Sequence, residues 1–177
     1  NDGGLYSACH GFGYSRFQHQ CDGIQLSLLQ YVPLDQPVKI SRLTLRNTSD
    51  KRRQLRVTAY AEWVLGRDRA ASAPYLISEF DAEQAVLLVQ NPWQTAFPDR
   101  VAFAALGSNT ALTGWTADRT EFIGRNHNMQ NPQALLRQQQ LSEADGAALD
   151  PCAVLQHSLS LAPGEQLELV FFLGQSA

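Results

Sequence analysis

Apolar and polar residues alternate with a period of two along most of the chain. Residues 38–47 and 52–65 show this alternation most clearly, and the polar stretch TSDK lies between them. Successive side chains of a strand point to opposite faces of a sheet, so this pattern predicts a long hairpin with one dry face and one solvated face. The residues expected on the dry face are Val38, Ile40, Leu43, Leu45, Leu55, Val57, Ala59, Ala61 and Trp63.

The same pattern continues on both sides of this pair. Residues 23–33 predict a strand with Ile24, Leu26 and Leu28 facing inward, and the stretch HGFGYSRF (residues 10–17) predicts an earlier strand. Three further strand pairs are expected at residues 75–80 with 85–90, 100–107 with 111–118, and 152–161 with 166–174. The Pro-Gly pair in APGE makes the last of these the clearest hairpin signal.

About ten strands joined by short turns indicate antiparallel sheets. Each sheet has an apolar face that must be covered by another layer. The predicted fold class is therefore all-β, an antiparallel two-sheet sandwich in one domain over residues 1–177, with closure into a barrel left open. The chain begins abruptly in strand-like sequence without an initiator methionine, which favours a fragment of a longer protein that lacks its opening strand or strands.

A long loop, residues 119–151, interrupts the alternation. It is rich in Asn, Gln, Gly and Pro, and it keeps a few apolar anchors. Long internal loops of this kind are usually functional or disordered. We expect one helical turn near residues 120–123 capped by Asp118, and another that starts at Pro132 with Asn131 as its cap. Residues 66–74 are expected to leave the sheet.

The composition of the chain argues against several classes of function. The net charge of −3 gives no general attraction to nucleic acid or to an anionic membrane surface. No apolar run approaches the roughly 20 residues that cross a bilayer. The three cysteines, Cys9, Cys21 and Cys152, have neither the number nor the spacing of a zinc site or a disulfide framework, so we expect buried thiols.

Candidate catalytic groups are sparse. Glycoside hydrolysis needs two carboxylates across a cleft, and the acids nearest to apolar surroundings are Glu62, Glu79, Asp81 and Glu121. Glu62 alternates with Ala61 and Trp63, so we expect it to be solvated or paired with an arginine. The four histidines are scattered, and no serine stands in a nucleophile elbow. We therefore predict no catalytic residue, no metal site and no cofactor within this chain.

Sugar binding is easier to support from the residues. Carbohydrate sites combine aromatic faces with Arg, Asn and Gln side chains that bind hydroxyl groups. The long loop and the turn after Asn91-Pro92 supply that combination, whereas Trp63 and Trp115 lie inside strand patterns and are expected in the core. The substrate-binding candidates are Trp93, Arg119, Phe122, Arg125 and Asn126.

Several ordered segments together resemble a known family. These are HGFGYSRF, the run from GIQLSLLQYVP to AEWVLG, and then DRTEFIGRN, NPQALL and LDPCAVLQ. They are similar to glycosyltransferase family 36 proteins, which comprise the glycoside hydrolase family 94 phosphorylases and the phosphorylase-like part of bacterial cyclic β-1,2-glucan synthases. The resemblance extends over nearly the whole chain.

The resemblance implies a β-supersandwich related to galactose mutarotase, which in the family precedes an (α/α)6 barrel. The barrel carries the catalytic aspartate and the inorganic phosphate of an inverting phosphorolysis, so this chain alone is expected to be inactive. The implied partners are the barrel of the same parent chain and a β-glucan oligosaccharide, with a homodimer as a further option. The implied location is the cytoplasmic face of a bacterial inner-membrane parent. The alternative is a self-contained carbohydrate-binding or mutarotase-like domain.

Overall fold

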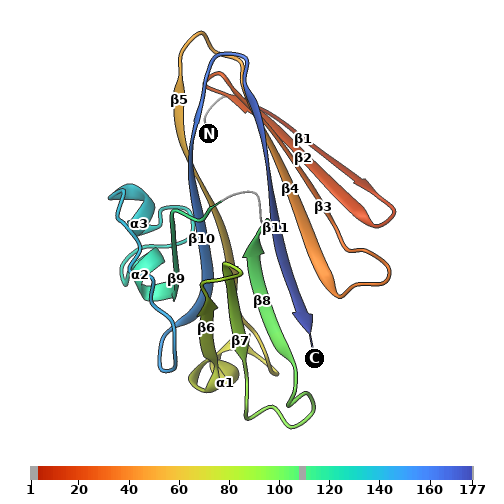
Figure 1. The fold of residues 1–177 in the computed structure, drawn as a ribbon, viewed down its shortest axis with the longest axis vertical. Helices are drawn as coiled ribbons and strands as arrows, with labels where there is room; N and C mark the ends of the chain where they lie inside the picture. Colours follow the sequence, from red (N-terminus) through yellow and green to blue (C-terminus); the bar gives the residue numbers. More distant parts are fainter. Residues whose placement is uncertain (1–3, 108–110, 177) are drawn as a thin grey trace.

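An antiparallel sheet of eight strands forms the larger layer of the molecule. The computed structural model describes residues 4–107 and 111–176 (Figure 1). The strands of the large sheet, in spatial order, are β1 (Leu5–Gly11), β2 (Tyr14–Cys21), β3 (Ile24–Tyr31), β4 (Val38–Asn47), β11 (Gln166–Ser176), β8 (Val101–Leu106), β7 (Val86–Gln90) and β6 (Ile77–Asp81).

A second, smaller sheet packs on one face of the large sheet. Its three antiparallel strands are β5 (Arg53–Glu62), β10 (Pro151–Leu161) and β9 (Gly114–Asp118), in that order. Short helical segments make up the rest: α1 (Arg69–Ser72), the 3-10 turn η1 (Ala73–Tyr75), α2 (Arg119–Ile123) and α3 (Gln133–Leu136). The predicted all-β fold with two antiparallel sheets and one long, partly helical loop is confirmed.

The strand pairing differs from the predicted hairpins. Residues 38–47 do form a strand, but β4 pairs with β3 and β11, whereas β5 pairs with β10 in the other sheet. The predicted hairpin across TSDK is therefore wrong. The predicted hairpin across APGE is wrong for the same reason, because β10 and β11 lie in different sheets. Both connections carry the chain from one layer to the other.

Two more predicted pairs have mixed outcomes. The hairpin of β6 with β7 is confirmed, with Ile77 opposite Gln90. Strands β8 and β9 lie in different sheets, so their predicted hairpin is wrong, and the Ser-Asn-Thr turn between them lies outside the described residues. The stretch HGFGYSRF is not one strand. It contains the end of β1, a turn with Gly13 at φ 79° and the start of β2.

Both sheet faces of β4 carry apolar side chains. Leu43 and Leu45 point into the sandwich, where they pack with Leu169 of β11. Val38 and Ile40 are an odd number of positions away from Leu43, so they lie on the outer face. The prediction of one dry face for β4 holds for its second half only. In β5 it holds throughout, because Leu55, Val57, Ala59, Ala61 and Trp63 pack in the interior.

The core lies between the sheets and continues beyond the small one. Trp63 and Trp115 are buried in the interior with Leu87 and Leu155, as predicted. A separate cluster covers the outer face of the small sheet, formed by Phe122, Ile123, Ala134, Leu141, Cys152 and Val154. The long loop is therefore a third layer: Figure 1 shows α2 and α3 lying beside β9 and β10.

Asn47 joins the two crossovers at one end of the sandwich. Its side chain is fully buried, and its amide nitrogen donates to the carbonyl oxygens of Lys51 (2.7 Å), Leu161 (3.0 Å) and Ala162 (3.1 Å). Its amide oxygen accepts from the Ser49 backbone N–H at 3.0 Å and the Ser49 hydroxyl at 2.6 Å. One side chain therefore satisfies groups from both the β4–β5 and the β10–β11 connections.

Asn47→Asp tests this arrangement, because it replaces the amide donor with a carboxylate of the same shape. The buried carbonyl oxygens then lose their donor and face a negative charge, and each unsatisfied buried group costs about 1–3 kcal/mol. We expect the free energy of unfolding to fall by at least about 2 kcal/mol in urea denaturation. Asn131→Asp, at an exposed position, is the matched control and should change it by less than about 0.5 kcal/mol. Equal effects of the two substitutions would contradict the role assigned to Asn47.

Candidate functional site

Helix α2 is built from strong local signals. Asp118 ends β9 in extended conformation, and its carboxylate accepts the Thr120 backbone N–H at 2.8 Å, so the predicted N-cap is confirmed. Gly124 ends the helix at φ 87°, and a Cβ there would lie 2.6 Å from the Gln133 side chain. The second predicted cap is wrong. Helix α3 begins at Gln133, so Pro132 occupies the N-cap position that was expected for Asn131, and no side chain caps the helix.

Glu121 ties the long loop to the small sheet. Its carboxylate accepts the Thr116 hydroxyl at 2.6 Å, and the backbone N–H and hydroxyl of Ser142 at 2.7 and 2.8 Å. On the inner side of the same helix, Phe122 stacks on Tyr60 with ring centroids 5.3 Å apart. The loop is thereby held in one position against the sheet.

A cluster of polar and charged groups joins β5, α1, α2 and the residue that precedes β10. We call the five residues Tyr60, Glu62, Arg69, Arg119 and Asp150 the Glu62 cluster. Glu62 accepts the Tyr60 hydroxyl at 2.7 Å and Arg119 Nε at 2.9 Å, and Arg69 Nε lies 3.2 Å from its carboxylate. Both arginines also pair with Asp150, Arg119 at 3.4 Å. The expectation that Glu62 pairs with an arginine is confirmed.

The electrostatics of this cluster favour its charged state. The hydrogen bond from Tyr60 and the contacts with Arg119 lower the pKa of the Glu62 carboxyl. Burial and the neighbouring Glu62 raise the pKa of the Tyr60 hydroxyl. Two cations face two anions, so the cluster is balanced. A balanced set of paired charges is typical of a structural network.

The five predicted substrate-binding residues fall into two groups. Phe122 is 2% exposed, and Arg119 pairs with Glu62 and Asp150 while 34% of its side chain stays exposed. Arg125 and Asn126 follow α2 and are exposed. Trp93 is 72% exposed in the β7–β8 connection. Direct sugar contact stays a prediction for all five.

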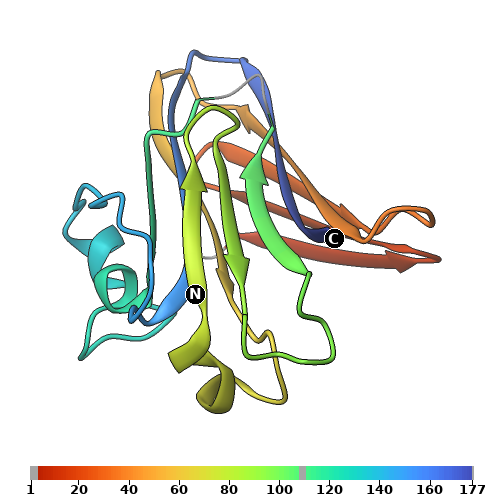
Figure 2. The same ribbon diagram turned by 60° about the horizontal axis from the view of Figure 1, so that its bottom comes forward.

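An exposed aromatic pair lies around Trp93. Its ring is 5.2 Å from that of Tyr75, which belongs to η1 and is 43% exposed. The Trp93 backbone N–H donates to the Asn91 side chain at 3.1 Å, and the Asn91 amide donates to the Leu65 carbonyl at 2.6 Å. This turn is separated from α2 in Figure 2, where the β7–β8 connection and the α2–α3 region occupy different sides of the molecule. The predicted residues therefore lie in two separate regions of the molecule, one at α2 and the residues that follow it and one in the β7–β8 connection.

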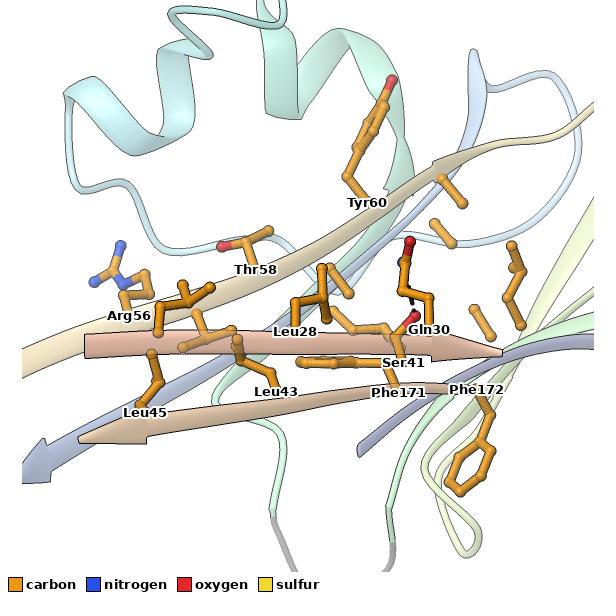
Figure 3. Close-up of a pocket in the computed structure, with 18 of the residues that line it drawn as sticks. Leu28, Gln30, Ser41, Leu43, Leu45, Arg56, Thr58, Tyr60, Phe171 and Phe172 are labelled. Atoms are coloured by element: carbon orange, nitrogen blue, oxygen red, sulfur yellow. Dashed lines mark hydrogen bonds between the residues drawn. The ribbon is translucent and has the colours of Figure 1, made fainter. Parts of the chain in front are cut away.

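A groove of about 640 Å³ opens between the two sheets. Its floor is the inner face of β3, β4 and β11, and its wall is β5 (Figure 3). The side chains on the floor include Leu28, Leu43, Leu45 and Phe171, whereas Phe172 points to the other side of the sheet. The alternation of β3 places Ile24, Leu26 and Leu28 on this face, but no local pattern predicts that the face is left open.

None of the described residues that line the groove is an aspartate or a glutamate. Of the acids considered, Glu62 and Glu121 are engaged as above, and Asp81 accepts the backbone N–H groups of Glu83 and Gln84 at 2.9 and 3.0 Å. Within residues 4–107 and 111–176 no group of three potential metal ligands comes together.

The cysteines are free thiols in three environments. Cys152 is buried, as predicted, and burial raises the pKa of its thiol, which keeps it unreactive. Cys21 is half-buried and Cys9 is exposed, so the expectation of a buried thiol is wrong for Cys9. Among the described helices, none is long and apolar enough to cross a membrane.

The sequence of the chain is similar to those of several known proteins. The chain matches the family described as glycosyl hydrolase 94, supersandwich domain, over residues 1–177. It is 38% identical to the cyclic beta-(1,2)-glucan synthase NdvB of Rhizobium meliloti over 97% of this chain and 6% of that protein. It is 27% identical to the solabiose phosphorylase of Paenibacillus borealis over 92% of this chain and 21% of that protein. The chain thus spans a small part of these relatives.

A solved structure shows the same fold without close sequence similarity. The putative aldose 1-epimerase of Escherichia coli superposes with a TM-score of 0.51 at 7% identity, over 97% of this chain and 68% of that one. The likeness is one of fold alone.

Glu62→Gln tests the balance of charges in the cluster. The folded-state pKa of Glu62 lies below its ordinary value of 4.5, so its contribution to stability is present above pH 4.5 and is lost as the pH falls through the folded value. We expect the variant to lose about 1–3 kcal/mol at pH 7. The gap to the wild type should narrow as unfolding is measured at progressively lower pH below 4.5, because the wild type then protonates the same carboxyl.

Glu168→Gln is the control for this measurement. Glu168 pairs with Arg42 at 2.9 Å on an exposed surface, where such pairs contribute at most about 1 kcal/mol. A loss at pH 7 as small as that of the control would show that the Glu62 cluster does not hold the loop.

Proposed function

The chain belongs to the glycosyl hydrolase 94 supersandwich family, and from that premise we propose that it is the non-catalytic β-sandwich domain of a bacterial cyclic β-1,2-glucan synthase. The observation that carries the proposal is the 38% identity to such a synthase over 97% of this chain. The lack of a carboxylate pair around the groove, among the described residues, is consistent with a catalytic centre elsewhere in the parent protein.

We propose further that the domain packs on an (α/α)6 barrel of the same parent chain. The outer face of the large sheet supports this, because an apolar row crosses it from β2 to β7: Tyr14, Tyr31, Ile40, Phe172, Ala105 and Val86. Tyr14 is 40% exposed, and four of the others are half-buried. A contiguous apolar surface of this extent is typical of a contact with another domain.

In this proposal the barrel supplies the reaction and this domain shapes the sugar cleft. The parent reaction is an inverting phosphorolysis that uses inorganic phosphate and acts on a β-glucan oligosaccharide at the cytoplasmic face of the inner membrane. Helix α2, fixed by Glu121 and the Glu62 cluster, presents Arg125 and Asn126 on a rigid support. Their guanidinium and amide groups are suited to bind sugar hydroxyls.

The second candidate is a self-contained carbohydrate-binding domain, and the Tyr75–Trp93 pair favours it. Exposed aromatic rings offer flat surfaces to the apolar faces of sugars. A mutarotase-like activity is less well supported, since it needs a His acid and a Glu base in one pocket. The groove contains His19 but no carboxylate among the described residues that line it.

The double variant Arg125→Ala/Asn126→Ala in the full-length protein tests the first proposal. If these groups bind sugar, we expect the KM for the glucan to rise about threefold to tenfold and the distribution of glucan lengths to shift, as the loss of one or two hydrogen bonds implies. Arg137→Ala removes an equally exposed arginine beyond α3 and serves as control. Unchanged phosphorolysis kinetics and glucan lengths in the double variant, and in Arg119→Ala, would refute a role for this loop.

Trp93→Ala tests the second candidate by calorimetric titration of the full-length protein with linear β-1,2-glucan oligosaccharides. Loss of one aromatic contact should weaken binding by about threefold to tenfold. Phe97→Ala, at another exposed aromatic of the same connection, separates a specific contact from general loss of apolar surface. Identical affinities for wild type and Trp93→Ala would remove this site from consideration.

A further inference from the structure

The two layers of the sandwich differ greatly in width. Eight strands form the large sheet and three form the small one within the described residues. Figure 1 shows β1, β2 and β3 extending beyond the region that the small sheet covers. The small sheet covers only part of the inner face of the large sheet. Among the described residues, the rest of that face has no second layer.

The uncovered inner face is apolar. The strand registers align Ala8, Phe17, Leu28 and Leu43 in one row and Tyr6, His19, Leu26 and Leu45 in the next. The end of each row under the small sheet is buried, whereas Tyr6 is 66% and Phe17 is 37% exposed at the other end. The apolar surface of the core thus continues into the open groove, where its outer end is exposed.

Strand β5 presents its edge to this groove. All seven consecutive residues from Leu55 to Ala61 line it. Side chains of alternate residues point to opposite faces of a sheet, so a cavity that touches every residue in a row lies beside the strand and not above one face. The other side of β5 is paired with β10, and no strand among the described residues pairs with the side that faces the groove.

An open edge of this length carries unpaired backbone groups. In an antiparallel strand every second residue directs its N–H and C=O to the same side. Thr58, in the middle of β5, also has a buried hydroxyl that forms no hydrogen bond with any described residue. Natural sheets protect long edges by covering, charging or shortening them. The groove side of β5 has only Arg56 as a charge along Leu55–Ala61.

The chemistry of the groove suits a strand better than a sugar. Its lining is dominated by Leu, Ile, Val, Ala and Phe, and it contains no acid among the described residues. Of its few polar groups, Gln30 and Ser41 already bond each other at 3.1 Å (Figure 3). A β-strand would match the site in both respects, since its backbone pairs with the edge and its alternate apolar side chains cover the floor.

We propose that an extended segment of the parent polypeptide, outside Asn1–Ala177, adds to β5 as a fourth strand of the small sheet and covers the inner face of β2 and β3. The occupant is a segment of the same polypeptide because the relatives are far longer than this chain, which spans 6% and 21% of two of them. The solved structure of the same fold is also longer, with 68% of its chain matched. A tethered strand binds at a high effective concentration.

This inference rests on the proposed function in one respect, namely that the parent is a larger protein. The segment should match β5 in length, and it should lie about 4.8 Å from it, with apolar residues at every second position facing Leu26 and Leu28. Its other face would lie on the same side as Arg56, Thr58 and Tyr60.

Amide hydrogen exchange of the full-length protein, read at residue resolution, tests the inference. If β5 is paired on both sides, all of its amides should exchange slowly, with the groove-side set slowed at least about a hundredfold relative to an unstructured peptide. Strand β4, also of ten residues and paired with both β3 and β11, is the internal reference. Alternate fast and slow amides along β5 would show an open edge and overturn the inference.

A matched pair of substitutions links this protection to the groove floor. Leu28 and Leu29 are neighbours on β3, both half-buried, on opposite faces of the sheet. We expect Leu28→Gln to accelerate exchange at the groove-side amides of β5 and Leu29→Gln to leave them unchanged. Equal effects of both variants would contradict a strand seated on the inner face. If Leu28→Gln fails to fold, the exchange pattern of the wild type still decides the question.

The concentration dependence of protection distinguishes the occupant. Protection that persists in a monomeric full-length protein, with mass verified by light scattering, supports a segment of the same polypeptide. Protection that appears only with dimer formation would overturn that assignment in favour of a second copy. The outcome is independent of the glucan measurements on Arg125 and Asn126, so failure of the proposed function would leave this test interpretable.

Discussion

A single buried amide joins the two connections through which the chain crosses between layers at one end of this sandwich. Asn47 is the last residue of β4, and its side chain binds carbonyl groups of the β4–β5 and β10–β11 connections. Its backbone adds two more bonds, from Asn47 N–H to the Glu165 carbonyl and from Gly164 N–H to the Asn47 carbonyl, both 2.9 Å. A sandwich whose consecutive strands cross between layers needs the crossovers to be fixed relative to each other, and this residue does so.

Sequence patterns predicted the strands and most of their faces, because alternation is a local property. They did not predict which strands pair. APGE does form a turn, in which Glu165 N–H donates to the Ala162 carbonyl at 3.1 Å, yet the strands on either side enter different sheets. Partner choice depends on contacts between distant positions, such as Leu43 of β4 with Leu169 of β11, which lie opposite each other and are buried together. One local signal does predict a pairing: Asp22-Gly23, with φ of 48° and 74°, is a preferred two-residue hairpin turn and joins β2 to β3.

In the candidate site, too, contacts between residues close in sequence could be predicted and contacts between distant residues could not. Asp118 could be predicted as a helix cap because cap and helix are adjacent in sequence. For the Glu62 cluster, the sequence predicts only that Glu62 pairs with an arginine. The identity of that arginine could not be predicted, since the members of the cluster come from four separate parts of the chain. The loop chemistry predicted Arg119 and Phe122 as ligand contacts. The fold also gives both side chains structural contacts, since Arg119 pairs with Glu62 and Phe122 stacks on Tyr60.

The central position of β4 and β11 in the large sheet has a consequence for how the chain reaches its native state. These strands occupy the middle of the sheet, yet β4 lies in the first third of the chain and β11 at its end. During synthesis, β1 to β4 can form a meander early, but one edge of β4 has to wait until nearly all 177 residues have been made. Folds dominated by such distant pairings form slowly, and their exposed strand edges can associate wrongly in the meantime. The pairing of β4 with β11 can therefore form only after the last of these strands has been made.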